Sequence, residues 1–251
     1  MMTEWVNGAI LFGAGCVAGT LNVVAGGGSF LTLPILIFLG LPATVANGTN
    51  RVAILLQNVG AVWGFHHHGV LAWRSGLWAA LPCTVGGVIG TWAALVVSDA
   101  AFQRILALLM VAVTLGTLWD PITSHESEPV SVVRPRAAAL AGGFFLAGIY
   151  GGFVQAGVGF LLLAATTMAG LDLVRGNAVK VLSVLILTGV SLALFAWQGK
   201  VDWAMGLILA AGNLLGGLLG VRLTILKGHA WVKRVVTATL LLFALKLWVS
   251  A

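Results

Sequence analysis

Residues 24–40, VAGGGSFLTLPILIFLG, decide the fold. Three consecutive glycines, Gly26, Gly27 and Gly28, stand inside an otherwise apolar run. Glycine destabilises the interior of a helix, so the run predicts a helix break. In hydrocarbon, every backbone group freed by such a break needs a partner. A break at membrane depth is therefore tolerated where protein covers it or where it lines a wet cavity.

The composition of the whole chain is that of a membrane protein. The chain has 251 residues, of which 60% are hydrophobic and 8% are charged. Residues 203–221 carry no charge over about the length that a spanning helix needs. We therefore expect an all-α integral membrane protein that crosses the inner cell membrane several times. The net charge of +6 comes from single Lys and Arg residues in short loops, so we expect no nucleic-acid partner.

An internal repeat divides the chain. Shifting the sequence by 130 residues places VAGGGSFL at 24–31 on VQAGVGFL at 154–161. The same shift pairs Asn47 with Asn177 and Trp73 with Trp203. We therefore predict a first transmembrane repeat over 1–120, a polar linker over 121–136 and a second transmembrane repeat over 137–251.

Each repeat is predicted to hold a glycine-broken pair of helices followed by three spans. In the first repeat these are helices near 8–24 and 30–40, then spans near 47–65, 73–97 and 100–119. The glycines could form the tip of a helical hairpin, or they could kink a single spanning helix. The distribution of basic residues between the two sides separates these topologies, because cytoplasmic loops carry the excess.

The hairpin topology gives the stronger bias, eight to three. One side collects Arg74, Arg134, Arg136, Arg175, Arg222, Lys227, Lys233 and Arg234, and the other collects Arg104, Lys200 and Lys246. The kinked topology divides the basic residues five to six between the two sides, which gives almost no orientation signal. We therefore predict hairpins, cytoplasmic basic loops and both termini outside. Each half then has an odd number of passes, so the two repeats would be inverted relative to each other, as in many secondary transporters.

The helix after each hairpin carries polar residues on one face. In residues 44–63, TVANGTNRVAILLQNVGAVW, the face passes through Asn47, Asn50 or Arg51, Ile54 and Asn58. The shifted positions hold Asn177, Lys180, Val184 and Thr188. Polar side chains thus recur at matched positions of both helices, which helix packing alone does not require.

Arg51 and Lys180 are the basic residues that we place within the bundle. Charges inside a membrane are costly and usually face a partner or a substrate path. No acidic residue lies close to either in the sequence, so an anion is the expected partner. The alternative is that both side chains snorkel from a helix end to the lipid headgroups.

The glycine breaks fit the same interpretation. The short helix after Gly28 and Ser29 begins with unsatisfied N–H groups and a positive dipole end, which favour an anion. Successive glycine amides can also form a concave nest for an oxyanion. The second helix break, over 155–159, would provide a second helix start of this kind, facing the first. The alternative is close helix packing through small residues, as we expect for Gly15 and Gly19 and for Gly212, Gly216 and Gly220.

Other reactive residues have simpler interpretations. Cys16 and Cys83 lie within apolar helices without metal spacing, and we interpret them as buried thiols, with a membrane redox pair as the alternative. His66, His67 and His68 diverge on a helix and indicate a hydrated turn. The sequence has no nucleophile elbow, phosphate loop or HExxH motif. We therefore expect neither an enzyme nor a bound metal or cofactor.

The motifs and their order resemble those of the TauE/SafE family of sulfite and sulfonate exporters. The resemblance rests on AGGGSFLTLP at 25–34, GLP at 40–42, ANGTN at 46–50, QAGVGF at 155–160 and GNAVK at 176–180. It implies a multi-pass transporter of small organosulfur anions, driven by the membrane potential or a proton gradient. It also implies site roles for Asn47, Thr49, Asn50, Asn177 and Lys180.

The sequence thus predicts a secondary transporter that exports a sulfite-like or sulfonate-like oxyanion by alternating access. The candidate binding residues are Gly26, Gly27, Gly28, Ser29, Asn47, Thr49, Asn50, Arg51, Gln155, Gly157, Asn177 and Lys180. The alternatives are a passive anion channel and, third, a membrane redox or assembly factor. The expected partners are the anion and the lipid bilayer, and a coupling proton and a homodimer are compatible with this interpretation.

Overall fold

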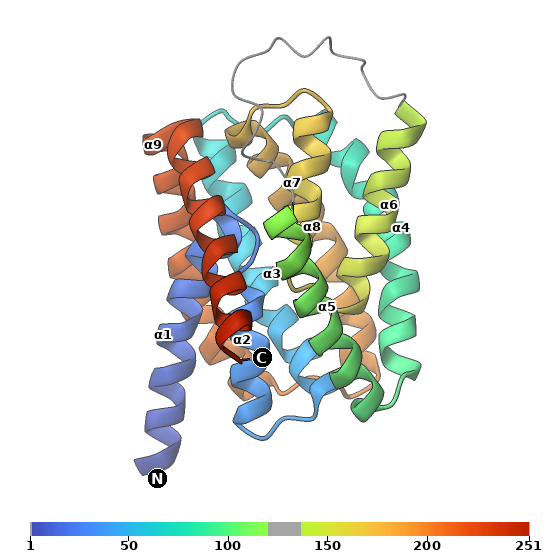
Figure 1. Cartoon of the computed structure of the whole chain (residues 1–251), viewed down its shortest axis with the longest axis vertical. Coiled ribbons are helices and arrows are strands. Elements are labelled where there is room, and N and C mark those ends of the chain that lie inside the picture. Colours follow the sequence, from blue (N-terminus) through green and yellow to red (C-terminus); the bar gives the residue numbers. More distant parts are fainter. Residues whose placement is uncertain (1, 120–136, 251) are drawn as a thin grey trace.

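The chain folds into a bundle of helices. The computed structural model describes residues 2–119 and 137–250, and every regular element in these residues is a helix (Figure 1). The helices are α1 (Met2–Val24), α2 (Ser29–Phe38), α3 (Ala43–His67), α4 (Trp73–Val96), α5 (Asp99–Trp119), α6 (Ala137–Phe153), α7 (Val158–Met168), α8 (Leu173–Trp197) and α9 (Trp203–Ser250). The all-α prediction is confirmed. The predicted linker over 121–136 lies outside the described residues.

Four stretches of helix within the described residues are long and apolar enough to cross a membrane. They are Trp5–Val24, Trp73–Val96, Leu173–Trp197 and Trp203–Gly228. Helix α3 has the same length as α8, with 25 residues each, but its buried Asn, Thr, Gln and Arg side chains make it more polar. The chain is therefore an integral membrane protein, and one of its central helices is polar.

Both predicted helix breaks are present. Helix α1 ends at Val24 and α2 begins at Ser29, while α6 ends at Phe153 and α7 begins at Val158. The turns use positive φ angles of 104° at Gly26 and 78° at Gly157, which glycine adopts without steric cost. Gln155 has a φ of 65°, which is rare for a residue with a side chain.

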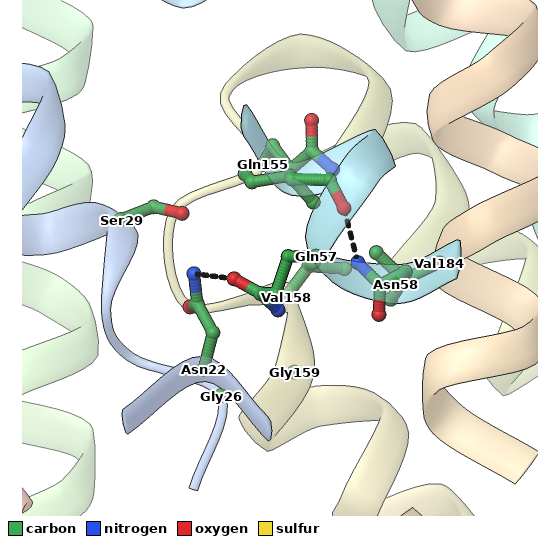
Figure 2. A pocket seen from close by; sticks show the side chains of 10 residues that line it. Asn22, Gly26, Ser29, Gln57, Asn58, Gln155, Val158, Gly159 and Val184 are labelled. Carbon is green, nitrogen blue, oxygen red and sulfur yellow. Dashed lines mark hydrogen bonds between the residues drawn. The ribbon is translucent and has the colours of Figure 1, made fainter. Parts of the chain in front are cut away.

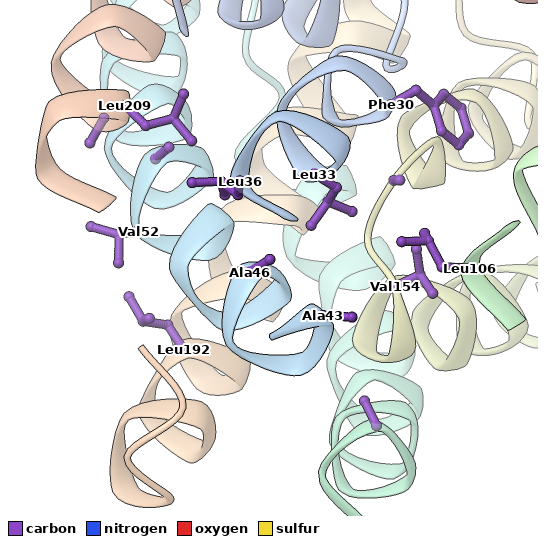
Figure 3. Packing of buried hydrophobic residues seen from close by; sticks show 14 of the residues in the cluster. Phe30, Leu33, Leu36, Ala43, Ala46, Val52, Leu106, Val154, Leu192 and Leu209 are labelled. Carbon is purple, nitrogen blue, oxygen red and sulfur yellow. The ribbon is translucent and has the colours of Figure 1, made fainter. Parts of the chain in front are cut away.

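The first break reverses the chain within the bundle. Figure 1 shows α1 rising from the N-terminus at the lower edge and α2 returning toward that edge, where α3 begins. Phe30, Leu33 and Leu36 of α2 are buried. They pack beside Ala46 and Val52 of α3 in one apolar cluster, which also includes residues of α5, α8 and α9 (Figure 3). The short helix is thus an interior element.

The 130-residue offset extends from the sequence to the helix boundaries. Adding 130 to the ends of α3, 43 and 67, gives 173 and 197, which are the ends of α8. The first residue of α4, 73, becomes 203, where α9 begins. A non-helical residue, Gly228, divides α9 just before the position that corresponds to the start of α5. Both halves therefore have the same order of helices.

Glycines allow two pairs of helices to pack closely. A Cβ atom on Gly15 would lie 2.6 Å from the Leu209 carbonyl oxygen of α9, and a Cβ on Gly19 would overlap Asn213. In the other half, Gly86 and Gly90 of α4 press in the same way against the backbone of α6. The predicted packing role of Gly15, Gly19, Gly212, Gly216 and Gly220 is confirmed, since all five meet a facing helix.

Candidate functional site

The two helix breaks meet in the interior. A Cβ atom on Gly26 would lie 2.5 Å from both the Cα and the carbonyl carbon of Gly159, so only glycine allows this crossing. Gly157 is covered in turn by the Phe30 ring at the start of α2, which a Cβ would approach to 2.6 Å. The breaks of both halves, far apart in the sequence, therefore form one central region.

A small cavity of about 20 Å³ lies beside this crossing. It is lined by Asn22, Gly26, Ser29, Ile54, Gln57, Asn58, Gln155, Val158, Gly159 and Val184 (Figure 2). One water needs roughly 10–15 Å³ by this kind of measure. The cavity therefore has room for about one water, and its lining has a polar side made of amides and an apolar side made of Ile54, Val158 and Val184.

Gln57 organises the polar side of the cavity. Its Oε1 accepts hydrogen bonds from Asn22 Nδ2 and from Asn213 Nδ2, both at 3.2 Å. Figure 2 shows the first of these bonds, from α1 to α3. Asn58 Nδ2 donates to the Ile54 carbonyl of its own helix at 2.8 Å. These contacts leave the Gln57 NH₂ group and the Asn58 oxygen as polar groups for a bound solute.

Gln155 connects the second break to α8. Its Nε2 donates to Thr188 Oγ1 at 2.5 Å, whereas its buried Oε1 has no hydrogen-bond partner. A hydroxyl can both donate and accept. Turning the amide by half a revolution would therefore keep the bond to Thr188 and direct the NH₂ group the other way. Gln155 can thus offer either a donor or an acceptor.

The first break also leaves backbone N–H groups without a hydrogen-bond acceptor. The Phe30 and Leu31 amides bond back to Gly27 and Gly28, and the Gly26 amide bonds to Leu21. Among the described residues, no acceptor is found for the amides of Gly27, Gly28 and Ser29. Free N–H groups at the positive end of a helix favour an anion.

Lys180 caps the end of α1 instead of reaching the surface. Its ammonium donates to the carbonyls of Asn22 at 3.0 Å and Val23 at 2.8 Å, and to Asn177 Oδ1 at 2.6 Å. Asn177 Nδ2 donates to the next carbonyl, Val24, at 3.1 Å. Lys180 is 2% exposed, so it does not snorkel. Two residues of α8 thus satisfy the last carbonyls of α1.

Arg51 and Asn47 do the same for the other half. Arg51 Nη2 donates to the carbonyls of Gly151 at 3.3 Å and Gly152 at 2.5 Å, and Asn47 Nδ2 donates to Phe153 at 2.8 Å. The Arg51 guanidinium also lies 4.8 Å from the centre of the Phe195 ring. Arg51 is fully buried. Each half therefore caps the broken helix of the other half, from α8 to α1 and from α3 to α6.

Two further predicted site residues, Thr49 and Asn50, are held by contacts away from the cavity lining. Thr49 Oγ1 accepts a hydrogen bond from the Asp202 amide, and Asn50 Oδ1 accepts one from Thr32. Of the twelve candidates, Gly26, Ser29 and Gln155 line the cavity; the other nine are not among its lining residues. Sequence reasoning did not select Asn22, Gln57 or Asn58 as site residues. The sequence feature that could have indicated Gln57 and Asn58 is their polarity within helix α3. For Asn22, it is an amide side chain just before the glycine run.

The histidines and cysteines lie elsewhere. His66 Nδ1 accepts a hydrogen bond from Trp73 Nε1 at 3.1 Å, and the His67 ring stacks on Trp63. His66, His67 and His68 are all exposed at the end of α3. Within the described residues no group of three His, Cys, Asp or Glu could hold a metal ion. Cys16 on α1 and Cys83 on α4 are both free thiols.

A bundle with several membrane-spanning helices and two interior helix breaks beside a small cavity defines a polytopic membrane protein. The sequence comparisons give its family. A model of the family described as "Sulfite exporter TauE/SafE" matches residues 11–247, so the chain belongs to the TauE/SafE family.

Curated relatives match nearly the whole chain. A "Probable membrane transporter protein" of Haemophilus influenzae is 28% identical over 91% of this chain and 89% of its own length. "Probable membrane transporter protein ORF9" of a Sinorhizobium species is 29% identical over 95% and 91%. "Probable membrane transporter protein YfcA" of Escherichia coli K12 is 28% identical over 95% and 88%. No solved structure matches the chain.

Proposed function

We propose that this protein is a secondary transporter that exports a small organosulfur anion, such as sulfite or a sulfonate, across the inner membrane. The observation that carries the proposal is a pair of buried cations, Arg51 and Lys180, beside a polar cavity at the crossing of two helix breaks. The printed names of the relatives, which are membrane transporters, support the same class of protein.

The two cations lie one helical turn from the cavity. Arg51 is three residues before the cavity-lining Ile54 on α3, which is about 4.5 Å along the axis at 1.5 Å per residue. Lys180 is four residues before the cavity-lining Val184 on α8, on the same helical face. At this range, buried positive charges stabilise an anion in the cavity, because the interior screens them less than water does.

The described acidic side chains do not neutralise these cations. Asp99 accepts hydrogen bonds from Thr44, Asp172 pairs with Arg175, and Asp202 accepts from the Met205 amide. All three lie at or just before the first residue of a helix. The positive charge of the interior is therefore available to a mobile anion, which favours an anionic substrate over a cationic one.

Alternating access follows from treating the halves as inverted repeats. The matched helix boundaries and the reciprocal capping between halves support this treatment. In such proteins, one bundle rocks against the other around a site formed by discontinuous helices. The cavity has room for about one water, so the structure corresponds to a closed state that must widen to admit sulfite.

The proposed orientation places the basic loops in the cytoplasm and both termini outside. Arg74 and Arg175 are exposed near the starts of α4 and α8, and Arg222 is exposed in α9, six residues before the non-helical Gly228, whereas Arg134 and Arg136 lie outside the described residues. A proton gradient or the membrane potential would supply the energy. A homodimer is compatible with this arrangement.

Counterflow in proteoliposomes tests the proposal. Vesicles loaded with unlabelled sulfite should take up ³⁵S-sulfite faster than empty vesicles, because a carrier returns faster with a bound substrate. A passive channel would conduct without this acceleration. Absence of sulfite, sulfonate and thiosulfate uptake under either condition would overturn the proposed substrate class.

A further inference from the structure

The two buried cations differ in how completely they are hydrogen-bonded. An ammonium has three donors, and Lys180 uses all three, on two carbonyls of α1 and on Asn177. A guanidinium has five N–H donors. Arg51 uses only Nη2, and both its Nε and Nη1 are buried without a partner.

Unpaired charged donors in an interior are expensive. A buried donor without an acceptor costs about 1–3 kcal/mol, and more when it is charged. The neighbouring residue adds to the cost, because Asn50 Nδ2 is also buried without a partner. Arg51 is 0% exposed, so bulk water does not relieve these groups. A ligand that accepts hydrogen bonds would relieve them, and a negatively charged oxygen would relieve them most.

The two cations approach the cavity from opposite ends of the bundle. The start of α3 packs against the end of α8, since a Cβ on Gly48 would approach Phe195. Phe65 near the end of α3 shares a core cluster with Ala178 near the start of α8. The helices are therefore antiparallel. Because Arg51 precedes Ile54 on α3 and Lys180 precedes Val184 on α8, the cavity lies between the two cations along the bundle.

We propose that these cations have separate roles in the transport function inferred above: Arg51 binds the anion directly through Nε and Nη1 on one side of the cavity, whereas Lys180 is a positioning residue that holds the end of α1. The anion would pass between the central cavity and Arg51 when that side opens. Lys180 has no donor left for it unless α1 is released.

The substitution Arg51→Lys separates the charge of Arg51 from its unpaired hydrogen-bond donors. Arg51→Lys keeps a cation that can bond to the Gly151 and Gly152 carbonyls, but it removes the unpartnered Nε and Nη1. Lys180→Met removes the cap from α1 and touches no donor of Arg51. The pair thus tests binding and positioning independently.

The experiment measures two quantities on each purified protein in detergent. One is the melting temperature without ligand, and the other is the affinity for sodium sulfite by calorimetry under nitrogen, with chloride as the control ion. Arg51→Lys should melt close to the wild type and bind sulfite at least about tenfold more weakly, as expected for a lost hydrogen bond to a charged group. Lys180→Met should melt lower than Arg51→Lys and lose less affinity than Arg51→Lys does.

The outcomes distinguish a failure of the inference from a failure of the proposed function. Equal sulfite affinity of the wild type and Arg51→Lys would overturn the assignment of Arg51 while leaving the transporter proposal standing. A larger affinity loss in Lys180→Met than in Arg51→Lys would reverse the two roles. If Lys180→Met fails to fold, the positioning role is supported, and Arg51→Lys still tests direct binding. Absence of sulfite binding by the wild type would overturn both the function and the inference.

Discussion

The molecule uses glycine in two regions for different purposes. Along the contacts of α1 with α9 and of α4 with α6, glycines let straight helices approach closely, and the facing atoms are mostly backbone. At the crossing of the two breaks, glycines turn the chain, and amide side chains with a small cavity surround them. The first region holds the helices of the bundle together, whereas the second leaves polar groups without hydrogen-bond partners. The contrast separates a packing role from a binding role for the same residue type.

The largest effect should come from filling a helix contact. Gly90→Val would place a side chain on the Ile149 carbonyl and the Phe153 amide of α6. We expect a loss of about 3 kcal/mol of stability, the upper end of the range for overpacked sites. Thermal unfolding of the purified protein measures it. Gly13→Val is the control, because no atom lies within 4 Å of a Cβ there. Equal stability of the two variants would contradict close packing of α4 on α6.

A smaller loss of stability, joined to a loss of transport, is expected at the crossing. Gly26→Ala introduces backbone strain at a φ of 104° and a steric overlap with the Gly159 backbone, 2.5 Å from the added Cβ atom. Gly40→Ala is a matched control, with a φ of 98° and no atom within 4 Å. The strain should cost each variant about 1–2 kcal/mol. Only Gly26→Ala should also abolish sulfite counterflow, and normal counterflow in that variant would show that the crossing does not move or bind.

Gln57 should show a smaller effect on function than Gly26, namely a weakening of sulfite binding at the cavity. Gln57→Met leaves Asn22 Nδ2 and Asn213 Nδ2 without their shared acceptor. We expect a loss of about 1–3 kcal/mol of stability from the unpaired donors and weaker sulfite binding. Gln103→Met, at an exposed position of α5, is the control for the substitution itself. Unchanged sulfite binding in Gln57→Met would remove this side of the cavity from the site.

The smallest effect is expected from the cysteines. Cys16 and Cys83 are free thiols on helices α1 and α4, and no disulfide joins them. Cys16→Ala with Cys83→Ala should therefore retain sulfite counterflow at nearly the wild-type rate. Transport lost in a folded double variant would favour the redox or assembly class instead.

The sequence predicts the secondary structure well because its signals are local. The glycine run around Gly26 marks the first break, and the 130-residue repeat then predicts the second near Gly157. The predicted helix near 30–40 is observed at Ser29–Phe38. Length, apolar composition and glycine are properties of a short segment, so they do not depend on how the halves meet.

The site was harder to predict because its contacts join distant segments. Lys180 was predicted to face an anion, and the structure gives it the carbonyls at the end of α1, 157 residues away in the case of Val23. Asn177 and Asn47 have equivalent partners. Helical periodicity identified the faces of α3 and α8 but not their partners. The free carbonyls at the C-terminal end of a helix can stabilise a buried cation, as a bound anion can, and the choice between these partners depends on the tertiary packing.

Ser29 offers the most direct test of a central site that opens alternately to each side. A single cysteine at Ser29, in the variant lacking Cys16 and Cys83, lies on the cavity wall at the start of α2. Alternating access predicts that a membrane-impermeant thiol reagent modifies it from either face of oriented vesicles, and that sulfoacetate slows both reactions. Modification from neither face, or at a rate that sulfoacetate leaves unchanged from both faces, would contradict a substrate site at the crossing of the helix breaks.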